Sequence, residues 1–177
     1  MGKIQLYIAV TIDGFIAREN GSLDWLDALP NPTGLDHGYA TFFAGVDTVV
    51  MGRKTYEEIL GFGVEWPYST CKAYVVTQDK NYQIQTKNTI LLNELNTSQI
   101  ELLKAETRQN IWVVGGGSLI THLLNLVVID EMILCLIPTI LSKGIKLFPD
   151  APKETSFSLL KAESFPTGVV NLTYQKR

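Results

Sequence analysis

Apolar runs alternate with amphipathic segments along most of this 177-residue chain. The runs have the length of buried strands, and the segments between them carry apolar residues at helical spacing. Strands are predicted at residues 4–10, 47–52, 72–78, 88–92, 111–114 and 131–137, and helices at 36–44, 53–60, 98–105 and 119–124. This alternation predicts an α/β fold with a largely parallel sheet covered on both faces.

The C-terminal part of the chain has a different pattern. The segments SFSLLKAES and VVNLTYQK, joined through Pro166-Thr167-Gly168, have the form of an antiparallel hairpin. Ser98 and Glu101 have the spacing of a capping box that opens the helix at 98–105. The chain shows no internal repeat or obvious linker, so one domain over residues 1–177 is expected.

Composition narrows the classes of function. A formal net charge of −3, with no basic cluster longer than Arg53-Lys54, argues against nucleic acid as a partner. The two cysteines, Cys71 and Cys135, have no metal-ligand spacing around them, so no metal is expected and a reducing cytoplasm is favoured. The apolar segment 123–141 contains Asp130-Glu131 near its middle, which argues against a membrane span.

Three consecutive glycines, Gly115 to Gly117, join the predicted strand at 111–114 to the following helix. Their lack of side chains would let a phosphate or ribose lie directly on backbone N–H groups at a helix N-terminus. The alternative is a tight strand-to-helix turn that binds nothing. The motif alone leaves these two interpretations at even odds.

A second strand-to-helix junction carries Gly52, followed by Arg53, Lys54 and Thr55 in the first helical turn. Cations at a helix N-terminus oppose the helix dipole by about 0.3–1 kcal/mol each, and a bound anion would reverse that penalty. A solvated basic pair is the alternative. Two such junctions in one domain nevertheless suggest a ligand with two separated phosphate groups, such as a 2′-phosphorylated dinucleotide.

Five segments together resemble a known superfamily. They are TIDGFIA (11–17), MGRKTYE (51–57), YVVTQ (74–78), IWVVGGGSLI (111–120) and PTILSKGIKLFP (138–149). In this order and spacing they resemble the dihydrofolate reductase-like superfamily, and most closely its RibD C-terminal branch from riboflavin biosynthesis. The resemblance implies a dihydrofolate reductase-like fold and an NADPH-dependent oxidoreductase acting on a small molecule.

The resemblance also implies the residues that would bind NADPH. Backbone groups of Ala9 and Ile16 would hold the nicotinamide carboxamide, and the loop from Asp13 to Leu23 would close over the ring. The Gly115–Gly116 bond would be a cis peptide, as in relatives. The remaining residues would bind the pyrophosphate, the riboses, the 2′-phosphate and the adenosine end: Gly52, Arg53, Lys54, Thr55, Thr77, Gln78, Gly115, Gly116, Gly117, Ser118 and Leu119.

Asp36 matches the acidic residue with which dihydrofolate reductases help the substrate ring gain its proton. A helix cap is the other interpretation of Asp36, and Asp27 is the fallback for the acid. Trp25 and Tyr39 would bind substrate, although Trp25 could equally be part of the core. The lone histidines, His37 and His122, are expected to have surface or helix roles.

Departures from the family patterns leave the substrate open. Cys135 stands where dihydrofolate reductases have a threonine, and Ile120 stands where they have a tyrosine after the glycines. Tyr7 and Val114 likewise depart from the pattern of the riboflavin reductases. Neither dihydrofolate nor the riboflavin-reductase substrate is therefore favoured, and we expect hydride transfer to a small heterocycle that is pterin-like or pyrimidine-like. The alternative is a non-catalytic nucleotide-binding sensor or interaction module of the same fold. The terminal hairpin could also extend the sheet across a two-fold axis in a homodimer.

Overall fold

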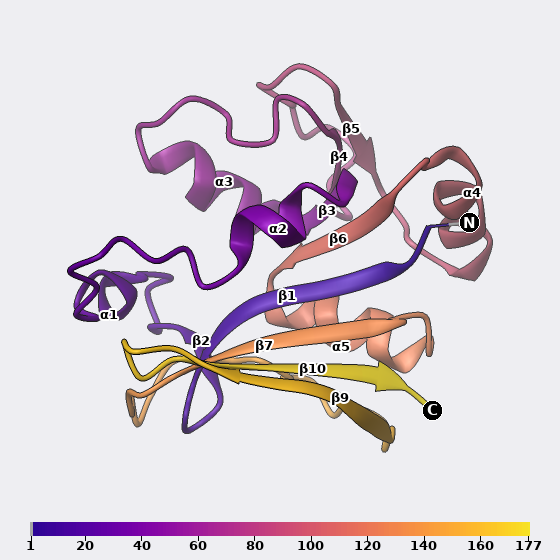
Figure 1. Cartoon of the computed structure of the whole chain (residues 1–177). Coiled ribbons are helices and arrows are strands. Elements are labelled where there is room, and N and C mark those ends of the chain that lie inside the picture. The colour runs from indigo at the N-terminus through magenta and orange to yellow at the C-terminus, as the bar shows by residue number, and fades with distance from the viewer. Residues whose placement is uncertain (1) are drawn as a thin grey trace.

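The computed structural model of the protein describes residues 2–177 (Figure 1). Its strands are β1 Ile4–Thr11, β2 Phe15–Ala17, β3 Val46–Gly52, β4 Lys72–Val76, β5 Thr89–Leu92, β6 Asn110–Gly115, β7 Glu131–Ile137, β8 Ile145–Lys146, β9 Phe157–Ser164 and β10 Val170–Lys176. Its helices are α1 Asp24–Asp27, α2 Tyr39–Phe43, α3 Arg53–Gly61, α4 Thr97–Glu106 and α5 Gly117–Asn125.

The central sheet has the strand order β5-β4-β3-β6-β1-β7-β10-β9. The strands from β5 to β7 run parallel, and β10 and β9 complete the sheet as an antiparallel hairpin, as predicted. β1 pairs with β7 along its length, from Gln5 opposite Glu131 to Thr11 opposite Ile137. Its pairing with β6 spans only residues 4–6, so the carboxyl-terminal half of β1 is not bonded to β6.

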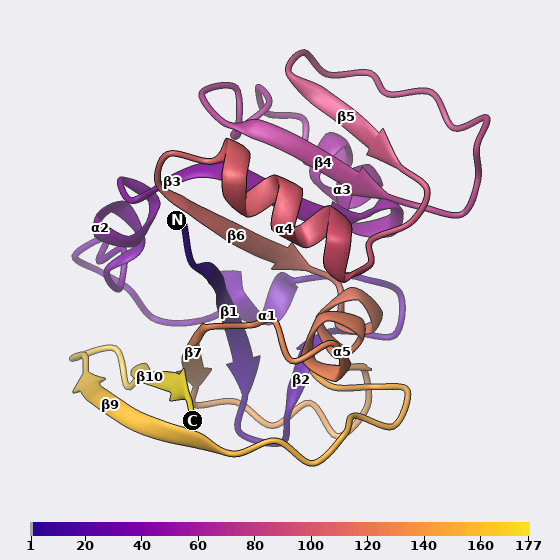
Figure 2. The same cartoon turned by 90° about the vertical axis from the view of Figure 1, so that its right-hand side faces the viewer.

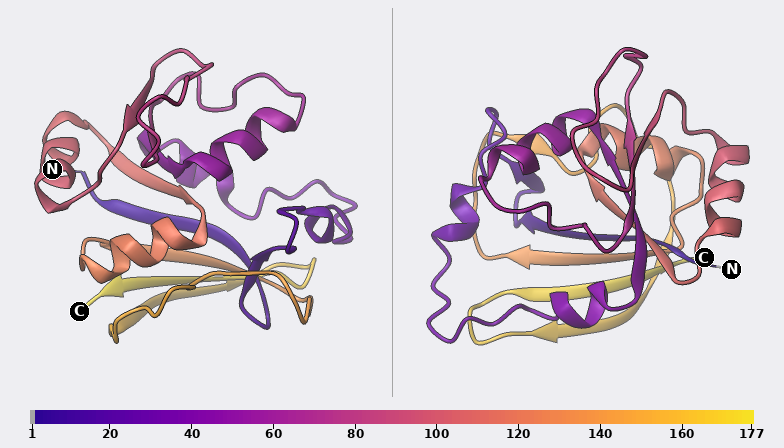
Figure 3. Two further views of the ribbon diagram at one scale, coloured as in Figure 1. Left: turned by 180° about the vertical axis from the view of Figure 1, so that it is seen from behind. Right: turned by 90° about the horizontal axis from the view of Figure 1, so that it is seen from above.

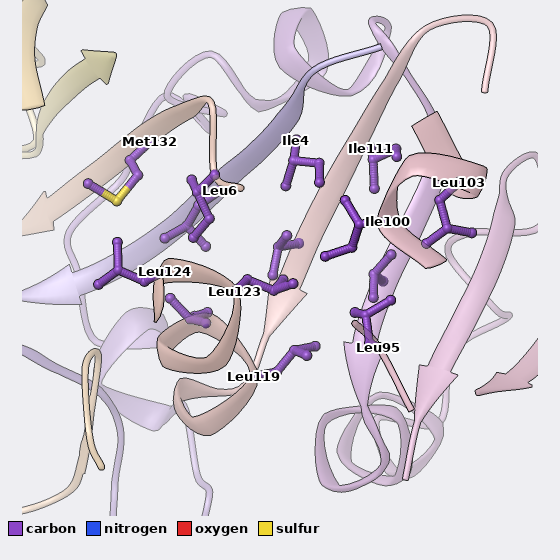
Figure 4. Close-up of a cluster of buried hydrophobic side chains, with 14 of the residues drawn as sticks. Ile4, Leu6, Leu95, Ile100, Leu103, Ile111, Leu119, Leu123, Leu124 and Met132 are labelled. Carbon is purple, nitrogen blue, oxygen red and sulfur yellow. The ribbon is translucent and has the colours of Figure 1, made fainter. Parts of the chain in front are cut away.

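Helices cover both faces of the sheet, as the apolar pattern predicted. On one face both α4 and α5 cover the sheet, and their leucines and isoleucines meet those of β1 and β6 (Figures 2 and 4). On the other face α2 and α3 bury aromatic side chains against β3, β4 and Trp112. Figure 3 shows the same layers from behind, with α5 in front of the strands. Apolar burial on both faces explains why these parallel strands are almost continuously hydrophobic.

Two local predictions are wrong. The capping box of α4 is formed by Asn96 and Gln99, each bonded to the other's backbone N–H at 3.1 Å, and not by Ser98 and Glu101. The helix predicted from residue 36 begins only at Tyr39, because Gly38 has a φ of 87° and interrupts the helical conformation. In both places the pattern of residue types shifted the helix start by one to three positions.

Three short elements lie outside the predicted pattern. They are α1 and the two strands β2 and β8, which pair Phe15 with Lys146 and Ala17 with Ile145. Elements of two to four residues show too little periodicity for the sequence to reveal them. The β2–β8 pair is held by contacts between segments that lie about 130 positions apart in the chain.

Candidate functional site

The two strand-to-helix junctions lie beside each other. β3 and β6 are parallel neighbours, with Met51 opposite Gly115. A Cβ atom added at Gly52 would lie 3.9 Å from both the Gly115 oxygen and the Gly116 nitrogen. We call residues 52–55 and 115–119 together the junction site. The junction site therefore lies at the carboxyl edge of the sheet, where ligands bind in open α/β folds.

Both helices of the junction site begin without a side-chain cap. Gly52 is the N-cap of α3 and Gly116 the N-cap of α5, and neither first turn contains an acidic residue. By contrast, α4 is closed by its capping box. The first N–H groups of α3 and α5 are left without intrahelical partners, and the dipole of each helix adds partial positive charge. This arrangement favours an anion such as a phosphate.

The glycines of the triad serve different purposes. The Gly115–Gly116 peptide is cis, which confirms the expectation from the family resemblance. A Cβ atom at Gly116 would approach the Thr55 hydroxyl to 3.3 Å, so Gly116 and Thr55 face one another. A Cβ atom at Gly117 would lie 2.5 Å from the Lys146 carbonyl oxygen. Gly117 is therefore required by tight packing, whereas Gly116 opens the backbone toward the junction site.

The basic pair of the junction site has unequal surroundings. Arg53 lies with Nη1 3.8 Å from an Asp79 oxygen and Nε 3.9 Å from a Glu57 oxygen, and its guanidinium is 5.6 Å from the centre of the Tyr82 ring. Lys54 is exposed and has no ion-pair partner among residues 2–177. Arg53 is thus already paired with two carboxylates, whereas Lys54 is available to bind an anion.

The loop after β4 brings Thr77 and Gln78 to the same edge as Arg53. The Thr77 hydroxyl accepts a hydrogen bond from the Asp79 amide at 3.2 Å, and its backbone bonds to Leu92 and Asn93. Gln78 is exposed.

The other two predicted coenzyme residues lie in the first turn of α5. The Ser118 hydroxyl donates a hydrogen bond to an Asp150 oxygen at 2.7 Å, and Leu119 is largely buried in the core.

The loop between β1 and β2 is fastened to the segment after β7. The Asp13 carboxylate accepts hydrogen bonds from the Thr11 hydroxyl at 2.6 Å and from the amides of Leu141 and Ser142. Gly14, with a φ of 85°, completes the turn that Asp13-Gly14 predicts. Ile16 follows in β2, so the loop expected to cover the nicotinamide begins with a defined shape.

A pocket lined by side chains lies around the carboxyl-terminal halves of β1 and β7. This side-chain pocket has a volume of about 270 Å³. Its walls combine apolar side chains with a few polar groups: Tyr7, Ala9, Leu26, Leu29, Asn31, Asp36, His37, Tyr39, Cys135, Ile137 and Val169. Small-molecule sites commonly have this mixture of apolar walls and few polar groups. Ala9 belongs both to this lining and to the predicted coenzyme residues.

Asp36 is the ionised group of the side-chain pocket. Its two carboxylate oxygens accept hydrogen bonds from the amides of Ala40 at 2.8 Å and Gly38 at 3.0 Å. These two bonds, the Ala40 bond first, hold the pKa of the Asp36 carboxyl below its usual range. The capping and pocket-lining interpretations of Asp36 are therefore compatible. Asp27, the fallback, is exposed on α1 and is absent from the pocket lining.

Tyr7 and Cys135 form the floor of the pocket. The Tyr7 hydroxyl donates to the His37 carbonyl at 3.2 Å, and the same carbonyl accepts from Asn171 at 2.6 Å. Burial, and next the neighbouring Cys135 thiol, raise the pKa of the Tyr7 hydroxyl far above its ordinary value. Burial also raises the pKa of the Cys135 thiol to about 11, against a smaller lowering by Tyr7. Both groups are therefore neutral at physiological pH.

The other predicted substrate residues occupy different positions. Tyr39 lines the pocket and packs edge-on against Tyr7 and Trp112. Trp25 is 3% exposed and packs in a cluster with Cys135, Ile137 and Val169, outside the pocket lining. Its buried indole N–H has no hydrogen-bond partner in the described part of the chain. Trp25 thus supports the pocket wall from the core side.

Two pocket residues were missed or misplaced by sequence reasoning. Tyr7 lies in a strand whose apolar pattern gives no hint of a polar function. His37 is expected to have a surface or helix role, and the structure places it just before α2 in the pocket lining, where its Nε2 lies 2.8 Å from the Thr167 hydroxyl. The partner Thr167 lies 130 positions away, so spacing could not have revealed this contact.

Two further properties apply to the described chain. Within residues 2–177 no group of three or more His, Cys, Asp or Glu side chains could hold a metal ion. Over the same residues no helix has both the length and the apolar character needed to cross a membrane.

Comparison with known proteins identifies the family. The family model of the RibD C-terminal domain matches residues 2–171. The chain belongs to the RibD C-terminal domain family. The uncharacterized protein YwjB of Bacillus subtilis is 38% identical to it over 167 residues, which cover 94% of each chain. The crystal structure of a putative riboflavin biosynthesis protein from Shewanella sp. PV-4 matches this RibD C-terminal domain with a TM-score of 0.90, at 30% identity and 99% coverage of both chains.

The fold extends to a more distant enzyme. Dihydrofolate reductase from Enterococcus faecalis, in complex with NADP(H) and RAB-propyl, matches with a TM-score of 0.68 and 17% identity, over 99% of this chain and 97% of that one. The dihydrofolate reductase-like fold and the RibD C-terminal family expected from the sequence are therefore confirmed. The chain thus shares its fold with a dihydrofolate reductase.

Proposed function

We propose that this protein is an NADPH-dependent reductase that transfers a hydride to a small heterocyclic substrate, pterin-like or pyrimidine-like. The observation that carries the proposal is that two uncapped helix N-termini meet at the carboxyl edge of β3 and β6, while the next strands of the same sheet, β1 and β7, carry a pocket whose ionised group is a carboxylate. The first feature suits a phosphate-bearing coenzyme, and the second suits a ring that carries N–H donors.

The junction site fits the phosphates of a dinucleotide. The amides at the start of α3 and α5 would bind the pyrophosphate, and Thr55 would add a hydroxyl between the two junctions. Arg53 and Lys54 would hold the 2′-phosphate, with Thr77 and Gln78 next to the adenosine end. Gly52 and Gly116 leave space for this contact because a side chain at either position would project between the junctions.

Bound NADPH supplies the hydride. The backbone of Ala9 in β1 and of Ile16 in β2 would orient the nicotinamide, and Ala9 also lines the side-chain pocket. The apolar walls of the pocket would shield part of the substrate ring from water, while Asp36 itself is exposed. A substrate held against these walls would lie next to Ala9, which is proposed to orient the nicotinamide.

Asp36 would promote protonation of the substrate without itself being the acid. Because backbone amides keep the exposed carboxylate ionised, it would favour the protonated form of a ring nitrogen beside it, with the proton taken up from solvent water. Tyr7 and Cys135 remain neutral and would contact the ring with weak polar groups. Tyr39 would pack against the ring, and Trp25 would hold the wall formed by Cys135 and Ile137.

The proposal is tested by titrating NADPH and NADH while tryptophan fluorescence is recorded. The loss of NADPH absorbance is then followed with dihydropterin, dihydrofolate, aminopyrimidine, imine and carbonyl substrates. We expect tight NADPH binding and oxidation with a ring substrate. Binding without oxidation by any compound would favour the non-catalytic nucleotide-binding module, and failure to bind NADPH at saturating concentration would contradict both functions.

The coenzyme assignment has its own variant test. Replacing both Arg53 and Lys54 with alanine is expected to weaken NADPH binding by about tenfold more than NADH binding. Equal losses for the two coenzymes would contradict the 2′-phosphate assignment.

Cytoplasmic location and a homodimer remain predictions. Size-exclusion chromatography with light scattering tests the homodimer.

A further inference from the structure

Arg53 is shared between two carboxylates of different origin. Asp79 follows β4, whereas Glu57 lies one turn further along α3 from Arg53 itself. The guanidinium lies between them, 3.8 Å from one carboxylate and 3.9 Å from the other. If Arg53 binds the 2′-phosphate, as the proposed function requires, that phosphate must compete with carboxylates already near the same cation.

Asp79 is positioned by its own turn. One of its carboxylate oxygens, Oδ1, accepts the Asn81 amide at 3.0 Å, and its amide donates to the Thr77 hydroxyl at 3.2 Å. The other oxygen, Oδ2, is the one that faces Arg53. The Asp79 carboxylate is therefore held near Arg53 by local hydrogen bonds. Among residues 2–177 Glu57 has no hydrogen bond to backbone amides; its carboxylate lies near the Tyr82 hydroxyl, and its pairing with Arg53 is an ordinary i, i+4 contact of a helix surface.

A carboxylate fixed beside Arg53, as that of Asp79 is, affects the choice between NADPH and NADH. A carboxylate after a strand of a nucleotide-binding α/β sheet can accept a hydrogen bond from a free ribose 2′-hydroxyl, and it repels a 2′-phosphate. An arginine in the same place has the opposite preference. The structure holds both groups together at the end of the coenzyme site.

Resting on the proposed function, we infer that Asp79 is a coenzyme-specificity residue: it competes with the 2′-phosphate for Arg53 and reduces the preference for NADPH over NADH. The wild-type protein accordingly binds both coenzymes, with a modest advantage for NADPH. Removing the charge of Asp79 releases Arg53 for the phosphate and increases that advantage.

The experiment compares Asp79→Asn with the matched variant Glu57→Gln. Asparagine keeps the oxygen that accepts the Asn81 amide, so the turn is preserved. Dissociation constants are measured by calorimetry for 2′,5′-ADP and 5′-AMP, which differ in the 2′-phosphate, and then for NADPH and NADH. In Asp79→Asn the ratio of NADPH to NADH affinity is expected to rise about fivefold, through tighter 2′,5′-ADP binding. In Glu57→Gln it is expected to change by less than about twofold.

Salt provides a second readout. The gain in Asp79→Asn is expected to shrink as ionic strength rises, because the contacts are partly exposed and screened. An unchanged affinity ratio in Asp79→Asn, or an equal gain in Glu57→Gln, would overturn the inference while leaving the reductase proposal intact. A wild-type protein that binds neither coenzyme would remove both, so the two failures are distinguishable.

Discussion

The junction site and the side-chain pocket are built from different parts of the chain. The junction site consists of two continuous segments, and its chemistry comes mainly from backbone groups at the start of α3 and α5. The pocket gathers side chains from β1, β7 and the loops around α1, α2 and β10. A backbone-built site depends on glycine and helix geometry, whereas a pocket built from side chains can change its ligand by single substitutions. Common coenzyme chemistry and a variable substrate are expected from such a division.

The largest expected effect concerns the pocket. Asp36→Asn should lower kcat/KM by about a hundredfold with the panel substrate that the wild type reduces, because the ionised group beside the ring is lost. The dissociation constant of NADPH should change by less than about twofold. Asp27→Asn is the control, since Asp27 is exposed and outside the pocket lining. An equal loss in both variants would argue that neither carboxylate acts locally.

The pH dependence of Asp36 sharpens the same prediction. The folded protein lowers the pKa of this carboxyl, so its ionised form stabilises the fold above the ordinary pKa of 3.8. That stabilisation is lost as the pH falls through the lowered pKa of the folded state. Wild type should therefore lose more stability than Asp36→Asn below about pH 4 in thermal melts. Parallel losses in the two proteins would contradict the role of the two backbone hydrogen bonds.

Two glycines of the junction site separate packing from binding. Gly117→Ala should destabilise the fold by about 1–3 kcal/mol, because the new methyl group would meet the Lys146 carbonyl oxygen at 2.5 Å. Denaturant unfolding measures this change. A Gly117→Ala protein as stable as the wild type would show that the segment at residues 146–149 moves aside.

Gly52→Ala is expected to have a smaller effect, on binding alone. Its φ of −75° suits alanine, and the nearest atoms to the new methyl group are 3.9 Å away, so stability should be nearly unchanged. The methyl group projects between the two junctions, and we expect about tenfold weaker NADPH binding by fluorescence titration. Unchanged affinity would place the coenzyme away from these glycines.

The smallest expected effect concerns Cys135. Because burial raises the pKa of its thiol to about 11, the pocket carries no thiolate charge near neutral pH. Alkylation of the folded protein by iodoacetamide should be slow below about pH 9 and should accelerate on unfolding, as mass spectrometry can show. Cys71, which is also buried, is the internal control. Fast labelling of Cys135 at neutral pH would show that the pocket opens readily to solvent.

Sequence reasoning was most successful where function depends on short, continuous segments. The alternation of strands and helices, the terminal hairpin and the two glycine-bearing junctions could all be predicted from residue order. The two junctions are adjacent because β3 and β6 are neighbouring strands. Residue order does not specify which strands of a parallel sheet are neighbours. The exact helix starts at Tyr39 and Thr97 were misplaced because caps depend on local hydrogen bonds rather than on periodicity.

The sequence by itself determined the fold class, the family and the two glycine-bearing segments proposed to bind phosphate, because apolar periodicity and glycine placement are local properties of the chain. Only the tertiary structure decided what surrounds the side-chain pocket and which groups share Arg53. Tyr7, His37 and Asp36 come together through strand pairing and loop packing, and Asp79 reaches Arg53 from the loop of a neighbouring strand. Such contacts join residues far apart in the chain, so their geometry exists only once the sheet has formed.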